Sequence, residues 1–316
     1  MQQPVLEVEG LTLEAGGHAL VEDVSFSVAP GEMLALVGES GCGKTVTALA
    51  VLRLLAPAVR IAAGRIVVDG TDVRALDPEG LRRLRGNRAG MIFQEPMTSL
   101  NPVFTIGEQI AESLRIHRGM SNQAARARAV ELLDLVGLPV PARQLDRYPH
   151  QMSGGQRQRV MIAIALSCEP KLLIADEPTT ALDVTVQAQI LDLIDRLRRD
   201  LGMACLLITH DLGVVGEVCD RAAVMYAGRI VETAPVAELF AHPRHRYTQA
   251  LIETMPASNP PGLRLPSIPG MVPPPGSRGT GCTFAPRCHG LLEDCVLLRP
   301  RLDEEGAHRV ACWNPA

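Results

Sequence analysis

Residues 33–45 read Met-Leu-Ala-Leu-Val-Gly-Glu-Ser-Gly-Cys-Gly-Lys-Thr, an apolar strand that runs into a glycine-rich loop. The loop, Gly38–Thr45, fits the pattern G-x-x-x-x-G-K-[ST] in full, and a helix is expected over residues 45–55. In such a strand–loop–helix unit the backbone N–H groups turn inward around phosphate oxygens, and the helix start adds partial positive charge. The stretch therefore predicts a phosphate site in an α/β fold, and a glycine turn that merely joins strand to helix is the disfavoured alternative.

Lysine is rare in this chain, since Lys44 and Lys171 stand among 31 basic residues. A lysine inside the loop supplies a compact cation for the β- and γ-phosphates, and the Thr45 hydroxyl is a Mg²⁺ ligand in this motif. The residues expected to contact the phosphates are Gly38, Ser40, Gly41, Gly43, Lys44, Thr45 and Val46.

A second candidate element is the acidic pair Asp176-Glu177, which ends an apolar run. Ligands of parallel sheets collect at the carboxyl ends of the strands, where Asp176 is expected to lie. Asp176 would hold Mg²⁺ through water, and Glu177 would polarise the water that attacks the γ-phosphate. The alternative is an ordinary strand end with a solvated acidic pair, which the nearby phosphate motif disfavours.

Composition limits the class of protein. The chain has 316 residues, 47% of them apolar, and a formal net charge of −4, which exclude wholesale disorder and a generally basic nucleic-acid binder. No stretch approaches the ~20 uninterrupted apolar residues that span a bilayer, and the first residues do not resemble a signal peptide. We therefore expect a cytosolic chain whose membrane role, if it has one, needs partners.

Local patterns predict the order of elements. Short strands are expected between residues 5 and 37 and at 65–70. Helices are expected between about 106 and 168, and Ser121 is expected to cap one of them. Strands are expected again at 171–176 and 204–209. A hairpin is expected over 222–233. Alternation of strands and helices predicts a parallel sheet. Eight prolines between residues 256 and 275 predict an extended linker before a cysteine-rich tail, so residues 256–316 are expected to form this linker and a small cysteine-rich C-terminal domain.

The string Met152-Ser-Gly-Gly-Gln-Arg-Gln-Arg159 narrows the assignment, because it resembles the signature of ATP-binding cassette (ABC) proteins. Gln94 matches the family's Q-loop, Asp183 its D-loop and His210 its switch histidine. The resemblance implies an ABC-type P-loop fold over residues 1–255, with an antiparallel β subdomain and a helical subdomain at about 95–168. It also implies ATP and Mg²⁺ as cofactors and ATP hydrolysis as the activity.

The resemblance assigns further roles. Glu177, His210 and Gln94 would be catalytic, and Thr45, Gln94 and Asp176 would hold Mg²⁺. The signature turn heads a helix, which makes a second anion site. Two such sites on one chain suggest a head-to-tail dimer, in which one subunit caps the phosphate held by the other. The capping residues would be Ser153, Gly154, Gly155, Gln156 and Asp183.

One stretch departs from the family. ABC proteins usually stack adenine on an aromatic residue in the first strands, whereas Leu13-Glu-Ala-Gly-Gly-His18 contains no aromatic hydrocarbon ring. His18 or a neighbouring apolar residue would take that role, or the affinity for nucleotide is lower.

Three further strings resemble the dipeptide, oligopeptide and nickel importers, namely Met97–Pro102, Tyr148–Gln151 and Asp183–Gln187. The segment after the signature is closer to the D type of that branch's two ATPases. The resemblance implies two membrane permeases, an F-type ATPase or a second copy as partner, an extracytoplasmic solute-binding protein acting indirectly, and a position on the cytoplasmic face of the inner membrane. The alternatives are a soluble ABC ATPase acting on nucleic acid or ribosomes, which the single cassette and negative charge disfavour, and an export ATPase.

Four cysteines, Cys282, Cys288, Cys295 and Cys312, lie in the tail. Clustered thiols in a cytosolic chain are typical of a metal site rather than of disulfides. The tail resembles the C-terminal domain of the same importers, where four thiolates can hold a [4Fe–4S] cluster. Zinc sites usually have tighter spacings, so a cluster is favoured over zinc, and a tail without metal remains the third alternative.

Overall fold

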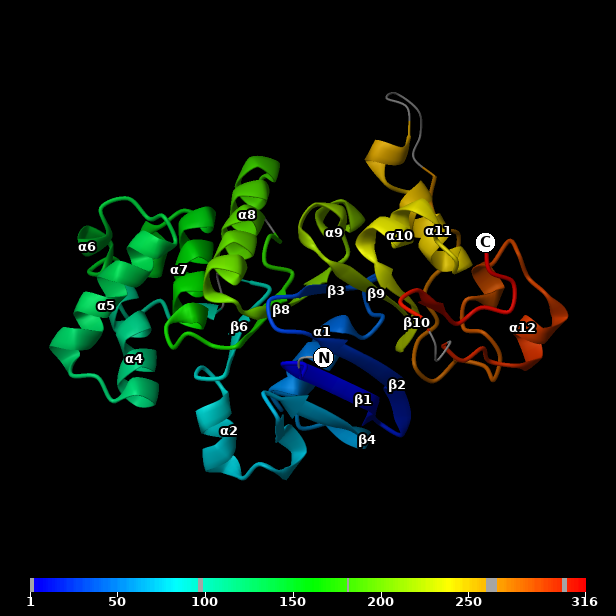
Figure 1. Ribbon diagram of the computed structural model, residues 1–316, viewed down its shortest axis with the longest axis horizontal. Helices are drawn as coiled ribbons and strands as arrows, with labels where there is room; N and C mark the ends of the chain where they lie inside the picture. The colour runs from blue at the N-terminus through cyan, green and yellow to red at the C-terminus, as the bar shows by residue number, and fades with distance from the viewer. Residues whose placement is uncertain (1–2, 96–98, 181, 260–265, 303–305) are drawn as a thin grey trace. The chain divides into compact units, whose positions relative to one another are not determined.

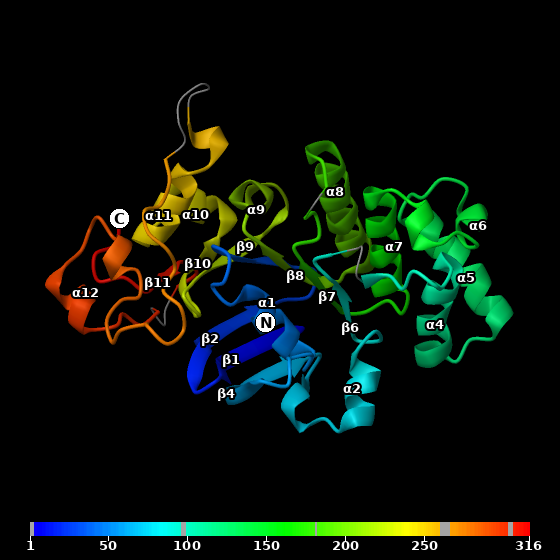
Figure 2. The same ribbon diagram turned by 180° about the vertical axis from the view of Figure 1, so that it is seen from behind.

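The computed structural model describes residues 3–95, 99–180, 182–259, 266–302 and 306–316. The chain divides into two compact units. Unit 1 comprises residues 1–6, 28–32 and 67–206, and unit 2 comprises residues 7–27, 33–66 and 207–316. Figures 1 and 2 show the elements of both units from opposite sides. Among the described residues, no helix combines the length and the apolar character that crossing a membrane requires.

Unit 1 is built on two parallel strands and a group of helices. Strand β6 (Ala89–Ile92) pairs with β7 (Leu172–Asp176), with Ala89 opposite Leu172. The other elements are β5 (Thr71–Asp72), α2 (Pro78–Leu84), α4 (Ile106–Arg118), α5 (Asn122–Leu135), α6 (Pro141–Gln144), α7 (Gly154–Leu166) and α8 (Val184–Leu201). Helix α4 packs on α5 and α7, and α7 packs on β6 and α8. These contacts make α7 the helix that joins the helical group to the strands.

Caps set the helix boundaries in unit 1. The Ser121 hydroxyl accepts the N–H of Ala124 at 3.3 Å, so α5 starts where the sequence predicted it. Helix α4 ends at Gly119, which adopts the left-handed conformation that favours glycine. The segment from residue 106 to 166 is helical as expected.

Unit 2 contains most of both sheets. Its strands are β1 (Leu6–Ala15), β2 (His18–Val28), β4 (Val59–Val68), β3 (Met33–Val37), β9 (Arg221–Tyr226), β10 (Arg229–Pro235) and β11 (Arg309–Val310). One sheet has the order β2-β1-β4, and in the other β11, β10, β9 and β3 are successive neighbours. Strand β3 is parallel to β9, whereas β9 and β10 form the predicted antiparallel hairpin. Strand β8 (Ala204–Thr209) passes from unit 1 into unit 2 at residue 206.

The helices of unit 2 are α1 (Lys44–Val51), α9 (Leu212–Val218), α10 (Val236–Ala241), α11 (Arg246–Glu253) and α12 (Glu293–Leu297). A single buried cluster joins β3, β9 and β10 to Tyr247 of α11 and to Phe284 of the cysteine-rich tail. The tail therefore shares a hydrophobic core with the sheet. A small cysteine-rich C-terminal domain within residues 256–316 stays a prediction, as does the boundary between it and the ABC domain of residues 1–255.

Candidate nucleotide site

The phosphate loop has the predicted strand–loop–helix form within unit 2. Strand β3 is buried throughout and ends at Val37, and α1 begins at Lys44. Gly43 caps α1 with a φ of 110°, and a Cβ there would lie 2.9 Å from the Met225 side chain. A Cβ on Gly38 would lie 2.1 Å from the Met225 carbonyl oxygen. Both positions therefore require glycine, because the loop passes directly against β9.

Helix α1 is shorter than the expected span of residues 45–55. It ends at Val51 with Leu52 as its C-cap, and Arg53 has a φ of 49°. A left-handed residue terminates an α-helix, so the chain leaves the helix one turn before the apolar run ends.

Lys44 turns back across the loop. Its ammonium group donates to the carbonyl oxygen of Gly38 at 2.7 Å and of Glu39 at 3.1 Å, and the residue is only 5% exposed. By contrast Ser40, Gly41 and Thr45 are exposed, and Val46 is half-buried. The loop thus presents exposed donors around a cation held at its base, which is an arrangement suited to an anion.

The two predicted acidic residues lie at the carboxyl end of β7 in unit 1. Asp176 is 2% exposed and Glu177 is half-buried. The Glu177 carboxylate accepts hydrogen bonds from the Gln94 side chain at 2.9 Å and from the Thr180 hydroxyl at 3.1 Å. Because β6 and β7 are parallel, their carboxyl ends meet at one edge, and this brings Gln94 to Glu177.

Sequence analysis missed Thr180 as a partner of Glu177. The Thr180 N–H donates to the Glu177 carbonyl oxygen at 3.1 Å, so residues 177–180 form a turn that returns the threonine to the carboxylate. The Pro178-Thr-Thr180 string after an acidic strand end is the signal for this turn.

The signature turn caps helix α7. The Ser153 hydroxyl accepts the N–H of Gln156 at 3.4 Å, and the Gln156 side-chain oxygen accepts the N–H of Ser153 at 3.1 Å. Ser153 and Gly154 are exposed, and a Cβ on Gly155 would lie 2.8 Å from Val186 of α8. The capping bonds and this close approach fix the position of the α7 N-terminus. Because that end of the helix is exposed, the partial positive charge of the helix dipole is accessible there.

The D-loop and switch residues lie at helix starts. The Asp183 carboxylate accepts the N–H of Val186 at 2.9 Å and so caps α8. This capping role was not predicted from the sequence. His210 is exposed and directly follows β8, and Asp211 caps α9. A nucleotide contact by Asp183 and a catalytic role for His210 stay predictions.

The predicted residues are distributed over both units. The phosphate loop and His210 belong to unit 2, whereas Gln94, Asp176, Glu177 and the signature and D-loop residues belong to unit 1. Thr45, Gln94 and Asp176 supply hydroxyl, amide and carboxylate oxygens, the donor type that Mg²⁺ prefers. Each of these groups is thus of a type that binds Mg²⁺, and their joint binding of one ion stays a prediction.

The stretch Leu13–His18, which contains no aromatic hydrocarbon ring, lies against the C-terminal tail at Gly17 and His18. A cavity of about 580 Å³ is lined by Gly17 of the β1–β2 turn, by His18 and Ala19 at the start of β2, and by Pro275, Gly276 and Thr280 from the tail. A Cβ on Gly276 would lie 3.3 Å from the His18 ring. No local pattern predicts this contact, because the two segments are far apart in the chain; Arg278 and Leu20, which are in contact, are 258 residues apart.

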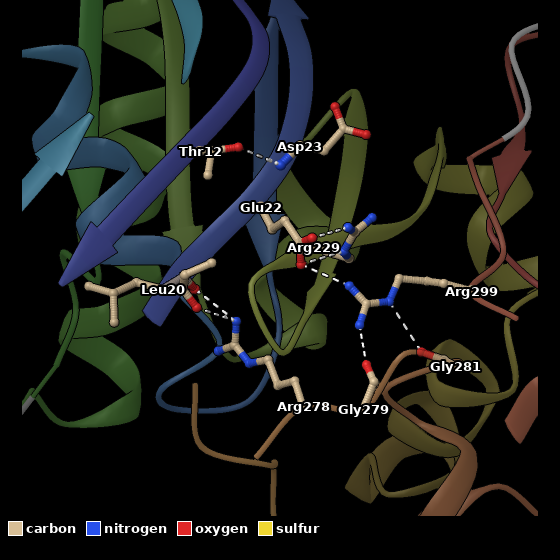
Figure 3. Close-up of polar contacts among 10 residues, drawn as sticks. Thr12, Leu20, Glu22, Asp23, Arg229, Arg278, Gly279, Gly281 and Arg299 are labelled. Atoms are coloured by element: carbon tan, nitrogen blue, oxygen red, sulfur yellow. Dashed lines mark hydrogen bonds and ion pairs between the residues drawn. The ribbon is translucent and has the colours of Figure 1, made fainter. Parts of the chain in front are cut away.

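Arginines of the tail hold it against β2 (Figure 3). Arg278 donates to the Leu20 carbonyl oxygen at 3.2 Å, and Arg299 forms an ion pair with Glu22 at 2.8 Å. Glu22 also pairs with Arg229 at 2.6 Å. The hydrogen bond from Arg229 and the charge of Arg299 lower the pKa of the Glu22 carboxyl, so it is ionised at neutral pH.

The four tail cysteines do not form the predicted metal site. All eight cysteines of the chain are free thiols, and the N–H of Cys282 donates to the Cys295 carbonyl oxygen at 2.8 Å. Among the described residues, however, no group of three or more His, Cys, Asp and Glu side chains is arranged to hold a metal ion. Burial raises the pKa of the Cys282 and Cys312 thiols above the usual value of cysteine. The structure thus supports neither the [4Fe–4S] cluster nor zinc.

Comparison with known proteins agrees with the geometry. The ABC transporter family matches residues 21–180, and the oligopeptide/dipeptide transporter C-terminal region matches residues 231–295. A chain of Brucella abortus, provisionally named a peptide import ATP-binding protein, is 52% identical over 97% of this chain and 96% of its own length. A chain of Brucella suis with the same kind of name is 50% identical over 98% of this chain and 94% of its own.

Solved structures show the same family. The ATP-binding cassette MJ0796, solved as a dimer in a post-hydrolysis state with ADP and Pi, has a TM-score of 0.65 and 28% identity over 73% of this chain and 98% of its own. The cbiO1 protein of Clostridium perfringens, part of the ABC transporter complex cbiONQ, has a TM-score of 0.67 and 27% identity over 76% of this chain and 92% of its own. The chain therefore belongs to the ABC transporter ATPases and carries the C-terminal region of their oligopeptide/dipeptide branch.

Proposed function

We propose that this chain is the ATP-hydrolysing subunit that powers import of di- or oligopeptides, or of a related small solute such as nickel, through a membrane ABC permease. The carrying observation is that one chain combines a complete phosphate loop with the oligopeptide/dipeptide C-terminal region. The names of relatives that are 50–52% identical over nearly the whole chain support the same function.

Each site residue has a role in this proposal. The N–H groups of Gly38–Thr45 and the Lys44 ammonium group bind the phosphates. Thr45, Gln94 and Asp176 hold Mg²⁺, which neutralises phosphate charge when bound. Glu177 accepts a proton from the attacking water. Gln94, hydrogen-bonded to Glu177, orients that water, and His210 steadies the phosphate that is attacked.

The proposal also names partners. Ser153, Gly155 and Gln156 of one ATPase cap the γ-phosphate held by another, which is an F-type paralogue or a second copy. Two permeases receive the ATPase pair at the cytoplasmic face of the inner membrane, and an extracytoplasmic binding protein delivers the solute. The net charge of −4 is unfavourable for the alternative, an ABC ATPase that acts on nucleic acid or ribosomes.

Transport assays test this function. We expect proteoliposomes that contain this chain, its permeases and its binding protein to accumulate labelled di- or tripeptide only with ATP, because hydrolysis drives the permease cycle. Lys44→Ala removes the cation that binds the phosphates and is expected to reduce uptake by at least about 100-fold. Arg126→Ala is the control. It removes an exposed arginine of α5 that pairs with Asp146, and it should leave uptake unchanged. Co-purification with ribosomes or nucleic acid, without any permease, would contradict the proposal.

A further inference from the structure

Arg287 of the tail contacts the phosphate loop within unit 2. Its guanidinium group donates to both carboxylate oxygens of Glu39, at 2.7 and 3.0 Å. The Arg287 side chain is 4% exposed and that of Glu39 is 30% exposed. Glu39 is the second residue of the loop. A bidentate pair of this kind is among the stronger polar contacts in proteins, and here its arginine is shielded from water.

Contacts other than the one with Glu39 also hold the guanidinium group of Arg287 in place. Its Nε donates to the Pro269 carbonyl oxygen at 2.7 Å, and its terminal nitrogens contact the Tyr226 hydroxyl at 3.3 Å and the Ile268 carbonyl oxygen at 3.4 Å. It also lies 5.7 Å from the Tyr226 ring centre and 5.9 Å from that of Phe284. A planar cation held by so many partners has little freedom, so it can impose a position on Glu39.

The backbone of Glu39 has a second anchor. Its N–H donates to the Tyr247 hydroxyl oxygen at 2.8 Å, and Tyr247 is fully buried. The Tyr247 ring centre lies 4.6 Å from that of Tyr226 and 5.4 Å from that of Phe284. The Arg287 guanidinium group and the Glu39 backbone therefore both contact one aromatic cluster, formed by Tyr226, Tyr247 and Phe284.

These anchors act on the part of the loop that binds Lys44. The carbonyl oxygens that accept from the Lys44 ammonium group belong to Gly38 and Glu39. Fixing the Glu39 side chain and N–H thus fixes the base of the loop, which places the lysine. The anchors of the Glu39 side chain and N–H lie outside the motif, since Tyr247 and Arg287 are 208 and 248 residues further along the chain.

We propose that Arg287 and Tyr247 are positioning residues that hold the phosphate loop in its nucleotide-binding conformation, which gives the oligopeptide-type C-terminal region a direct part in ATP binding. The inference rests on the proposed function of the loop as the ATP site. When only a fraction of molecules has the competent loop, the apparent dissociation constant rises by the inverse of that fraction. Saturating ATP restores the competent loop, so KM rises while kcat is preserved.

The test measures ATP affinity of the full-length chain by calorimetry, and KM and kcat of the assembled transporter. We expect Arg287→Gln to raise Kd and KM for ATP about tenfold and to change kcat less than about twofold. Tyr247→Phe removes only the hydroxyl and should raise KM about threefold. Glu39→Gln combined with Arg287→Gln should be no worse than the more severe single variant, because both remove the same contact.

Arg299→Gln is the matched control. Arg299 anchors the same tail to β2 through Glu22 (Figure 3). Its other hydrogen bonds are to Gly279 and Gly281 of the tail rather than to the loop. It should leave the KM for ATP within about twofold of the unaltered chain. An equal rise in KM with Arg299→Gln, or unchanged KM in folded Arg287→Gln and Tyr247→Phe, would overturn the inference while leaving the proposed function intact. Failure of the unaltered chain to bind ATP would overturn both.

Discussion

Glu177 has a φ of 45°, a left-handed conformation that costs a residue with a side chain of order 1 kcal/mol. The conformation ends β7 sharply and turns the carboxylate toward Gln94 and Thr180, which both donate to it. Strain of this kind persists where the surroundings over-determine the backbone, and functional sites are common among such places. The geometry thus favours Glu177 over the adjacent, buried Asp176 as the group that contacts a water molecule.

Replacing the carboxylate tests this assignment. Glu177→Gln keeps the shape of the side chain but cannot accept the proton, so we expect hydrolysis to fall by about 10²- to 10⁴-fold while ATP still binds. Steady-state phosphate release and calorimetric titration with ATP measure the two effects separately. Glu169→Gln, which removes an exposed carboxylate paired with Arg128, should leave both unchanged. Brisk turnover by Glu177→Gln would remove this residue as the base.

The position of single residues was predictable where a short motif sets it, whereas residues that act through distant contacts were missed. Lys44, Ser153 and Gln156 lie at the loop base and the helix start, as their motifs predicted. Arg287 and Tyr247 were not found, because their partner Glu39 is 248 and 208 positions away and no local pattern encodes that approach.

At the scale of elements, boundaries were predictable where a capping residue or glycine marks them, as at Ser121 for α5. The end of α1 was not, because an ordinary arginine, Arg53, takes the left-handed conformation there. The cysteine spacing led to a wrong expectation for the structure, since spacing does not report how the thiols are oriented. The order of the strands within unit 2 likewise depends on long-range pairing, such as β3 with β9, rather than on local pattern.

Helix α11 supplies a pH-dependent prediction. Burial lowers the pKa of His245 to about 4, and its Nδ1 accepts the N–H of Tyr247 at 3.0 Å, which caps the helix and needs the neutral ring. Between pH 6.5 and 4 the unfolded chain takes up a proton that the folded chain does not, so stability falls as the pH falls. We expect the free energy of unfolding to be lower at pH 5 than at pH 7 by about 2 kcal/mol from this residue.

Urea unfolding at several pH values measures the effect. His245→Asn keeps a capping group without an ionisable ring, so its stability should depend less on pH over this range. His242→Asn changes an exposed histidine nearby and serves as the control, with the pH dependence of the unaltered chain. Parallel pH profiles for His245→Asn and the unaltered chain would show that His245 does not contribute.

At the scale of the whole molecule, the two elements that are predicted to bind anions, the phosphate loop and the start of α7, lie in different units, and each has exposed residues. If the start of α7 in one ATPase caps the nucleotide that the phosphate loop of another ATPase holds, the Glu177→Gln chain of 34.0 kDa should associate with ATP to about twice that mass, alone or with its F-type paralogue. Ser153→Ala removes a cap at the contact and should prevent association. Ser121→Ala removes an equivalent cap from α5, costs a similar ~1 kcal/mol and should not prevent it. Light scattering that finds only monomers with ATP, in both mixtures, would contradict the paired arrangement.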